Sequence, residues 1–195
     1  MTDAQTGRRA SSLRQRDFRL LIIGKTFGWM ALHMIMVAIA YQVYDRTGDV
    51  MNLAYIGLAT FAPAIGFALI TGYVADRFDR RLVLVVTYGI IFVGAVLLYL
   101  YTASGMEAVW PVFAILALEG TGRAFHQPAV NSLVPNLVPA ESFPNAVAWH
   151  STINKITQMV GPALGGILYL AGPEIVYVTA AAGLLIALIM TAFIR

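Results

Sequence analysis

The stretch 72–81, which reads GYVADRFDRR, carries two acids and three arginines within its last six residues. It lies between two apolar stretches, at about 51–75 and 82–102. Because charge inside lipid is costly, these side chains predict a turn at a membrane–water boundary. The excess of arginine favours the cytoplasmic boundary. From charge alone, the arginines are expected to anchor the topology of the chain.

A second group of polar residues lies inside an apolar stretch at about 146–170. His150, Asn154 and Gln158 recur every four residues and therefore share one face of a helix, with Lys155 at its edge. Polar side chains in a membrane span are costly unless they face protein or water. We interpret this face as the lining of a substrate cavity, with hydrogen bonding between helices as the alternative.

Lys155 requires an opposite charge, and Glu119 in the preceding apolar stretch is a candidate. Counted from the cytoplasmic ends at about 1.5 Å per residue, the two side chains lie at a similar depth. Glu119 and Lys155 would then form an ion pair across the cavity, or would bind a charged substrate between them. Arg123 competes for Glu119 because the two residues are four apart on one helix. Both pairings remain open.

His33 lies four residues after Trp29 in the first apolar stretch. A histidine at this depth is able to relay protons, but hydrogen-bonded packing is favoured because no acid lies beside it. No spacing of His, Asp and Glu suggests a metal site, and no phosphate-binding loop of the GxxxxGK[ST] type occurs. We therefore expect no catalytic residue, no metal and no cofactor, and we do not expect an enzyme.

The composition is that of a membrane protein. Hydrophobic residues make up 59% of the chain and charged residues only 12%, against about 25% in an ordinary soluble domain. The net charge of +3 does not indicate a nucleic-acid partner, because the basic residues flank apolar stretches rather than forming one face. With no cysteine, disulfides and thiolate chemistry are excluded. The expected surroundings are a lipid bilayer.

Six stretches have the length of about 20 apolar residues that a helix needs to cross lipid. They predict an all-α membrane protein whose six helices follow a polar cytoplasmic tail at 1–17 and form a bundle over 18–195. The expected spans are about 18–44, 52–75, 82–102, 108–127, 146–170 and 175–194. A proline-rich stretch at 128–145 is expected to be a cytoplasmic loop that divides the helices three plus three.

The distribution of basic residues predicts the orientation. Only Arg46 lies in the loops assigned to the outside, together with several acids. This bias places the N-terminus in the cytoplasm. Ser142 and Pro144 are expected at the start of the fifth span, as N-cap and first-turn residue. The basic residues at the cytoplasmic ends are Arg8, Arg9, Arg14, Arg16, Arg19, Arg77, Arg80, Arg81 and Arg123.

The pattern Gly72-x-x-x-Asp76-Arg77-x-x-Arg80-Arg81 resembles the loop 2–3 signature of the major facilitator superfamily. Asp79 stands where that superfamily usually has glycine. The resemblance implies that Asp76 and the arginines form a gate that locks the inner ends of helices together and releases them as access changes.

Two further patterns extend the resemblance. Gly161-Pro162-Ala163-Leu164-Gly165-Gly166 is similar to the helix-five motif of exporters in the superfamily, which implies a flexing helix; static close packing by small residues is the alternative. The stretches 123–129 and 133–135 are similar to the enterobactin-exporter and macrolide-efflux branch. The likeness does not reach the helix-four motif of many proton-coupled members, since Leu116 and Glu119 replace its arginine and glutamine.

The resemblance implies a secondary active transporter in the bacterial cell (inner) membrane. It would export a small amphipathic molecule, drug-like or siderophore-like, by alternating access. Such transporters have twelve spans, so the chain corresponds to the N-terminal half, and its partner would be a missing C-terminal half or a second copy. The alternative is an inactive truncated remnant or a six-span scaffold.

Overall fold

The computed structural model describes residues 12–194, with only the backbone described at Ala75 and Asp76. Within that range the chain is helical throughout and no strand forms. The predicted arginines Arg8 and Arg9, and most of the predicted tail, lie outside the described residues. The elements are η2 (Ser12–Arg14), α1 (Arg16–Thr47), α2 (Met51–Gly66), α3 (Ala68–Arg77), α4 (Arg80–Ala103), α5 (Trp110–Leu137), η3 (Ala140–Ser142), α6 (Phe143–Tyr169) and α7 (Pro173–Ala192).

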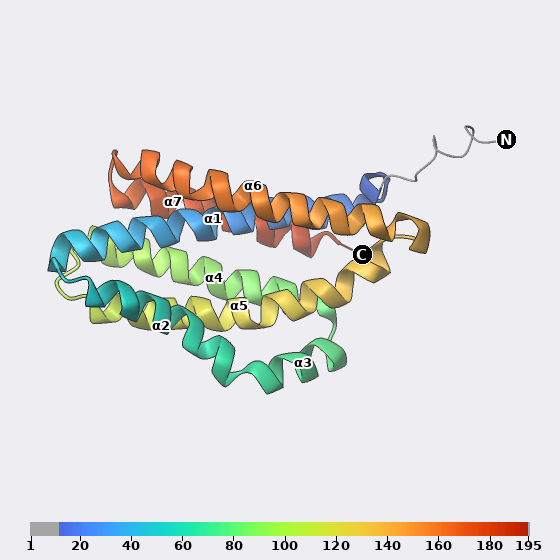
Figure 1. Ribbon diagram of the computed structural model, residues 1–195, viewed down its shortest axis with the longest axis horizontal. Coiled ribbons are helices and arrows are strands. Elements are labelled where there is room, and N and C mark those ends of the chain that lie inside the picture. Colours follow the sequence, from blue (N-terminus) through green and yellow to red (C-terminus); the bar gives the residue numbers. More distant parts are fainter. Residues whose placement is uncertain (1–11, 195) are drawn as a thin grey trace.

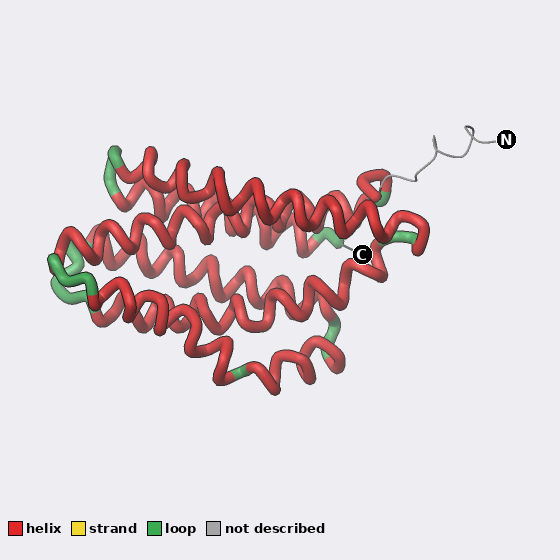
Figure 2. Tube along the Cα trace, in the orientation of Figure 1, coloured by secondary structure: helices red, strands yellow, loops and turns green. Residues whose placement is uncertain are grey.

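The long helices lie side by side and alternate in direction, joined by short turns at both ends (Figure 1, Figure 2). The start of α1, the α3–α4 turn, the α5–α6 connection and the end of α7 gather at one end. α1 packs most extensively against α6 and α7, α4 packs against α5 and α7, and α2 packs against α5. Contacts of α1 with α2 and α5 are sparse, which leaves a gap in the packing on that side of the bundle.

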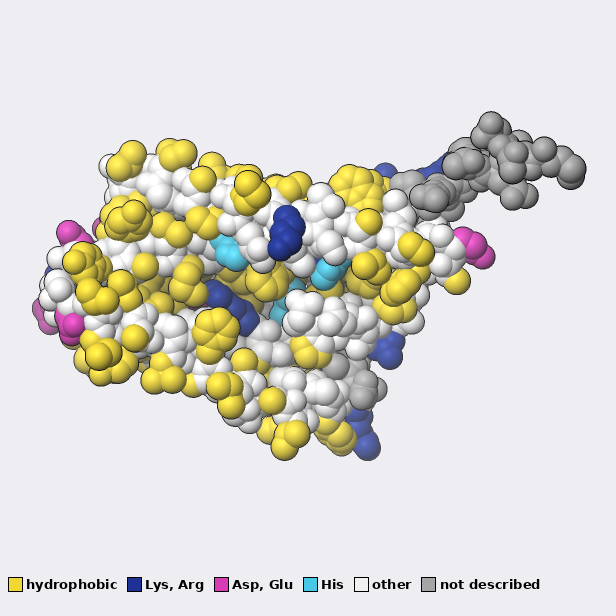
Figure 3. Space-filling view, viewed as in Figure 1, with side chains coloured by type: hydrophobic (Ala, Val, Ile, Leu, Met, Phe, Trp, Pro, Cys, Tyr) yellow, Lys and Arg dark blue, Asp and Glu magenta, His cyan; other side chains and the backbone are white. Residues whose placement is uncertain are grey.

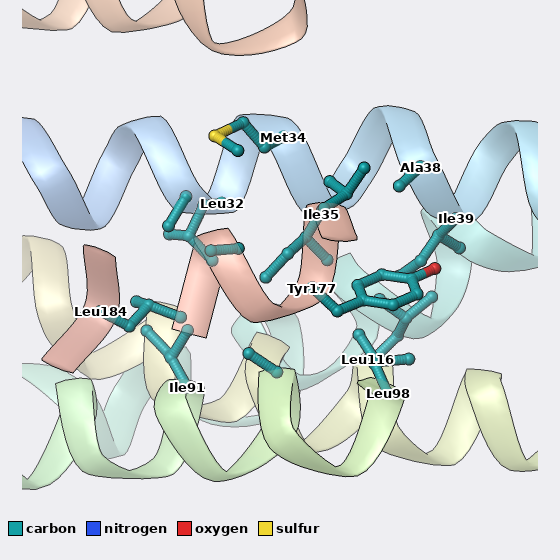
Figure 4. Packing of buried hydrophobic residues seen from close by; sticks show 14 of the residues in the cluster. Leu32, Met34, Ile35, Ala38, Ile39, Ile91, Leu98, Leu116, Tyr177 and Leu184 are labelled. Carbon is teal, nitrogen blue, oxygen red and sulfur yellow. The ribbon is translucent and has the colours of Figure 1, made fainter. Parts of the chain in front are cut away.

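The core is apolar and joins α1, α4, α5 and α7. In its larger cluster, Ile35 and Ile39 of α1 meet Leu98 of α4 and Tyr177 and Leu184 of α7 (Figure 4). A smaller cluster, which includes Phe18, Leu84 and Val130, lies nearer the end that holds the chain termini. These clusters make α1, α4 and α7 a scaffold that positions the more loosely packed α2.

Large apolar side chains cover the outside of the bundle. Leu69, Leu170, Ile65 and Met159 are more than three quarters exposed. A soluble protein rarely exposes contiguous apolar surface to this extent. Three helices, α1, α4 and α7, are long and apolar enough to cross a membrane, and α2 with the first part of α3 makes a fourth candidate if the bent pair is one span.

The second predicted span is broken in the structure. The sequence predicted one helix at about 52–75, but the chain bends by 56° between α2 and α3, next to Phe67. Pro63 lies inside α2 one turn before the break. Because proline lacks an N–H and its ring crowds the preceding turn, it favours a bend at this point. Figure 1 shows α3 turning away from the line of α2.

The predicted proline-rich loop at 128–145 is wrong. α5 continues through Pro128 and Pro135 to Leu137, and α6 already begins at Phe143. Each proline removes one backbone hydrogen bond, but the last part of α5 buries an apolar face that outweighs this loss. That face comprises Ala129, Val130, Leu133 and Val134. Ser142 and Pro144 do stand at the start of α6, as the sequence predicted.

Candidate functional site

A cavity of about 640 Å³ lies between α1, α2 and α5, where α1 packs only sparsely against the other two helices. Its wall is mostly apolar and includes Met36, Leu53, Ile56 and Phe61. Trp29, His33, Thr60 and Arg123 add polar groups to the wall. Figure 3 shows Lys, Arg and His side chains gathered in the middle of this face, whereas the other charged side chains lie at its two ends.

Glu119 and Arg123 of α5 form an ion pair, with 3.6 Å between Arg123 Nη2 and Glu119 Oε2. The Glu119 side chain is 0% exposed, whereas that of Arg123 is 22% exposed and reaches the cavity wall. Gly94 of α4 makes room for the carboxylate, because a Cβ at that position would lie 2.5 Å from Glu119 Cγ. The structure thus contains the second of the two pairings left open by the sequence.

Lys155 takes no part in that pair. Its side chain is exposed on α6, and among the side chains that the structure describes, which leave out Asp76, the Glu119–Arg123 bridge is the only ion pair. On the same helix, His150 and Asn154 are half-buried and Gln158 is exposed. None of these four residues lines the cavity between α1, α2 and α5. A contact between them and a substrate stays a prediction.

Sequence reasoning missed Lys25 and His126. Lys25 of α1 is 1% exposed, and the one hydrogen bond of its Nζ goes to the backbone carbonyl of His150, at 3.5 Å. His126 of α5 is buried beside Thr87, and its Nε2 has no hydrogen-bond partner. The spacing Lys25, Trp29, His33, one residue per helical turn, was the available signal.

The residues of the helix-five motif bring α6 close to the cavity wall. A Cβ at Gly161 would lie 2.6 Å from the Cβ of His33, and one at Gly165 would lie 2.9 Å from the Cα of Met34. Gly166 has open space around it, and α6 remains helical through Pro162. Gly161 and Gly165 therefore act as close-packing residues between α6 and α1, and a flexing role of the helix stays a prediction.

The loop motif lies where α3 ends and α4 begins. Asp79 caps α4: its Oδ1 accepts hydrogen bonds from the backbone N–H of Arg81 at 2.8 Å and of Leu82 at 3.2 Å. The Arg81 guanidinium donates to the carbonyl of Ala192 and so ties α4 to the end of α7. Asp79 thus has a local structural role that accounts for its departure from the usual glycine.

The remaining members of the loop motif are more open. The Arg77 guanidinium lies 5.8 Å from the ring centre of Tyr73, and Gly72 has nothing within 4 Å of an added Cβ. Arg80 and Arg81 line a recess of about 400 Å³ together with Leu133. The side chain of Asp76 lies outside the described residues, so its part in a gate stays a prediction.

No group of three or more His, Asp or Glu side chains in the described part of the chain has the geometry of a metal site. An apolar cavity with a few convergent polar groups is the usual form of a small-molecule site.

The profile of the transmembrane secretion effector family, a branch of the major facilitator superfamily, matches residues 8–195. The chain belongs to this family of membrane transporters, on the efflux side of the superfamily. This membership and the all-helical bundle agree with the resemblance seen in the loop motif. They indicate a transporter rather than a catalytic enzyme.

Individual relatives are similar at low identity. Macrolide efflux protein A of Streptococcus pyogenes is 28% identical over 152 residues, which cover 78% of this chain and 38% of the relative. Macrolide efflux protein A of Enterococcus faecalis is 31% identical over 117 residues, covering 60% of this chain and 34% of the relative. The staphyloferrin A transporter of Staphylococcus aureus is 26% identical over 153 residues, covering 76% and 36%.

The chain spans less than half the length of these curated relatives. No solved structure matches it significantly.

Proposed function

We propose that this chain forms the N-terminal half of a secondary active transporter that exports a small amphipathic molecule. The observation that carries the proposal is the cavity of about 640 Å³ between α1, α2 and α5, whose mostly apolar wall includes His33 and Arg123. An apolar wall suits the body of an amphipathic molecule, and the few polar groups fix its orientation. The names of the efflux relatives support the direction of transport.

In this proposal the membrane spans are α1, the bent pair α2–α3, α4, α5, α6 and α7. The turn at Phe78 then lies in the cytoplasm, and the bundle over 18–195 follows a cytoplasmic tail at 1–17. The arginines at that end of the bundle support this orientation in the bacterial inner membrane. The proposed partner is a second six-helix bundle, either a C-terminal half or a second copy.

Alternating access would come from rocking of the two bundles around the cavity. The scaffold of α1, α4 and α7 would move as one body because a continuous core joins these helices. The loop motif is proposed to hold the inner ends of helices together, with Asp76, Arg77 and Arg80 as the gate. Arg81 already links α4 to α7 within this bundle.

The test uses the complete reading frame that encodes this chain, expressed in a bacterial strain that lacks its own drug exporters. Accumulation of an amphipathic fluorescent dye is measured with and without the protein. Gly57 lines the cavity and has nothing within 4 Å of an added Cβ, so Gly57→Trp introduces a bulky side chain at the cavity wall from a position whose Cβ meets no neighbour. The neighbouring Leu58 is exposed on the outside of α2, so Leu58→Trp is the matched control.

We expect lower dye accumulation with the wild-type protein and with Leu58→Trp, and near-control accumulation with Gly57→Trp. Equal accumulation with and without protein, for every dye tried and with the protein present in the membrane, would favour the scaffold or inactive remnant. Full export by Gly57→Trp would place the substrate path elsewhere.

A further inference from the structure

The interior of the bundle carries an excess of basic side chains. Within the described residues, Glu119 is the one acid in the middle of a helix; the others lie near helix ends or in connections. Its carboxylate is already paired with Arg123. The basic side chains away from the helix ends are Lys25, His33, Arg123, His126, His150 and Lys155. A cation inside a membrane protein normally has an opposite charge nearby, and among the described side chains the buried Lys25 makes no ion pair.

The guanidinium of Arg123 has donors that Glu119 does not satisfy. The carboxylate meets Nη2 at 3.6 Å, too far for a hydrogen bond, and neither Nε nor Nη2 of Arg123 has a hydrogen-bond partner. The side chain forms part of the cavity wall. A guanidinium offers donors in a planar fork that fits a carboxylate or phosphate. Buried donors without partners are rare unless a ligand or water satisfies them.

His33 shares that cavity wall, and its Nε2 also has no hydrogen-bond partner. Behind the wall, a void of about 10 Å³ is lined by Arg123, His126, Trp29 and Tyr88. A void of that size holds about one water molecule, so a ligand must sit in the larger cavity in front of it. The ligand would therefore meet Arg123 and His33 directly.

Lys25 lies two helical turns before His33 on the same face of α1. It is almost completely buried in α1, and its Nζ donates a hydrogen bond to the backbone carbonyl of His150 at 3.5 Å. A long hydrogen bond to a carbonyl does not neutralise an ammonium group. In a medium of low polarity, such a charge attracts an anion over a longer distance than it would in water.

We infer that the molecule transported through this cavity is an amphipathic organic acid, whose anionic group binds Arg123 and His33 while its apolar body contacts α2. The inference rests on the proposed function and adds the substrate class. The apolar part of the wall, with Leu53, Ile56 and Phe61 of α2, provides the surface for that body.

The experiment compares three dansyl probes of similar size: dansylglycine is an anion, dansylglycinamide is neutral, and dansylethylenediamine is a cation. Each is titrated by fluorescence into the purified protein encoded by the complete reading frame, and each is tested in a transport assay in proteoliposomes. We expect dansylglycine to bind at least about tenfold more tightly than the amide, since hydrogen bonds to charged groups have this strength.

Arg123→Gln is expected to remove this preference while leaving the affinity for the amide within about twofold, because the apolar wall is unchanged. Arg123→Lys keeps the charge and loses the fork, so part of the preference should remain, which also guards against a folding defect. Arg46→Gln is the matched control: Arg46 lies at the other end of α1, exposed, and bonds the carbonyl of Gly105 at 2.7 Å. It should bind like the wild type.

Equal affinity for the three probes, a preference for the cation, or a preference for the acid that survives Arg123→Gln would overturn the inference. Inorganic phosphate that competes as strongly as dansylglycine would show a site for free anions and contradict an amphipathic substrate. If the protein transports dansylglycinamide or dansylethylenediamine but not dansylglycine, the proposed organic-acid substrate is wrong, whereas the proposed transport function stands. Absence of transport for all three probes would count against the proposed function itself.

Discussion

Glu119 is completely enclosed, so its charged carboxylate depends on neighbouring groups for stabilisation. Arg123 supplies the positive charge from one turn further along α5, and Gly94 of α4 supplies the space. Because the two charges are on the same helix, their separation is set by the helix and not by the packing of the bundle. The pair would therefore persist through the helix movements of the proposed alternating access.

A double-mutant cycle tests this pair. Removing one partner of a buried ion pair costs about 3–5 kcal/mol, because the other charge stays buried without compensation. Arg123→Gln and Glu119→Gln should each lower the stability of the protein in detergent by an amount near this range, and the double variant should regain much of the loss. The measurement is denaturant-induced unfolding, with coupling expected at roughly 0.5–3 kcal/mol.

The cycle of Glu119→Gln with Lys155→Gln is the comparison. These two changes should be additive, because Lys155 is exposed on α6 and makes no ion pair with Glu119. A coupling larger for Glu119 with Lys155 than for Glu119 with Arg123 would reverse the assignment of the pair.

Asp79 gives a second prediction at the residue scale. Its carboxylate accepts two backbone N–H groups at the start of α4, so Asp79→Ala should cost about 1 kcal/mol of stability. Asp79→Gly should cost only a few tenths of a kcal/mol, because glycine is also accepted at a helix N-cap. Thermal unfolding of both variants in detergent distinguishes them. Equal losses would mean that the carboxylate has a role beyond the cap.

At the scale of elements, α2 and α5 cross closely at one point. A Cβ at Gly120 would lie 2.4 Å from the carbonyl oxygen of Thr60, which is backbone and cannot move away by itself. α2 is held mainly by α5, so this crossing sets the position of α2 and with it the width of the cavity between α1, α2 and α5. The crossing thus links the packing of two helices to the shape of the candidate site.

Gly120→Ala should force α2 away from α5 and lower both stability and dye export. The control is Gly89→Ala in α4, where the nearest atom, Cδ1 of Leu188, lies 3.8 Å from the added Cβ and is in ordinary contact. The same methyl group should be tolerated there, and alanine also favours the helix. Export assays and thermal unfolding compare the activity and stability of Gly120→Ala with those of Gly89→Ala. Wild-type behaviour of Gly120→Ala would show that α2 adapts at no cost.

The helices themselves were predictable from the sequence because apolar length is a strong and local signal. The breaks were not. Proline usually ends a helix, yet Pro128 and Pro135 lie within α5, while the chain bends one turn after Pro63. Whether proline ends, bends or merely weakens a helix depends on the packing of the residues around it, which a single sequence does not contain.

The candidate site was partly predictable for a similar reason. Residues that share one helix face follow from spacing, so the pairing of Glu119 with Arg123 was among the alternatives. The meeting of His33 with Arg123 in one cavity wall depends on how α1 and α5 are placed, and it needed the fold. Lys25 was missed because it lies only seven residues after the start of the predicted span at about 18–44. From the sequence alone, a basic residue there is hard to distinguish from one at the membrane boundary.

At the scale of the whole molecule, charge is arranged in three layers. Arginines dominate the end with the α3–α4 turn, and acids dominate the opposite end. The Lys, Arg and His side chains away from the helix ends lie between these two layers (Figure 3). The first two layers suit the cytoplasmic and outer surfaces of a membrane, in that order. The middle layer is the one that membrane insertion alone does not explain, and it supports the transport proposal.

The orientation gives the last prediction, and the absence of cysteine makes it direct to test. Phe78 in the α3–α4 turn and Val50 in the α1–α2 turn are both more than half exposed at opposite ends of the bundle. In intact cells, a maleimide that does not cross the membrane should label Val50→Cys and leave Phe78→Cys unlabelled. After the membrane is permeabilised, both should react to a similar extent, which excludes burial as the cause. Labelling of Phe78→Cys from outside would invert the bundle, place the arginines on the wrong surface, and remove the basis for a cytoplasmic gate.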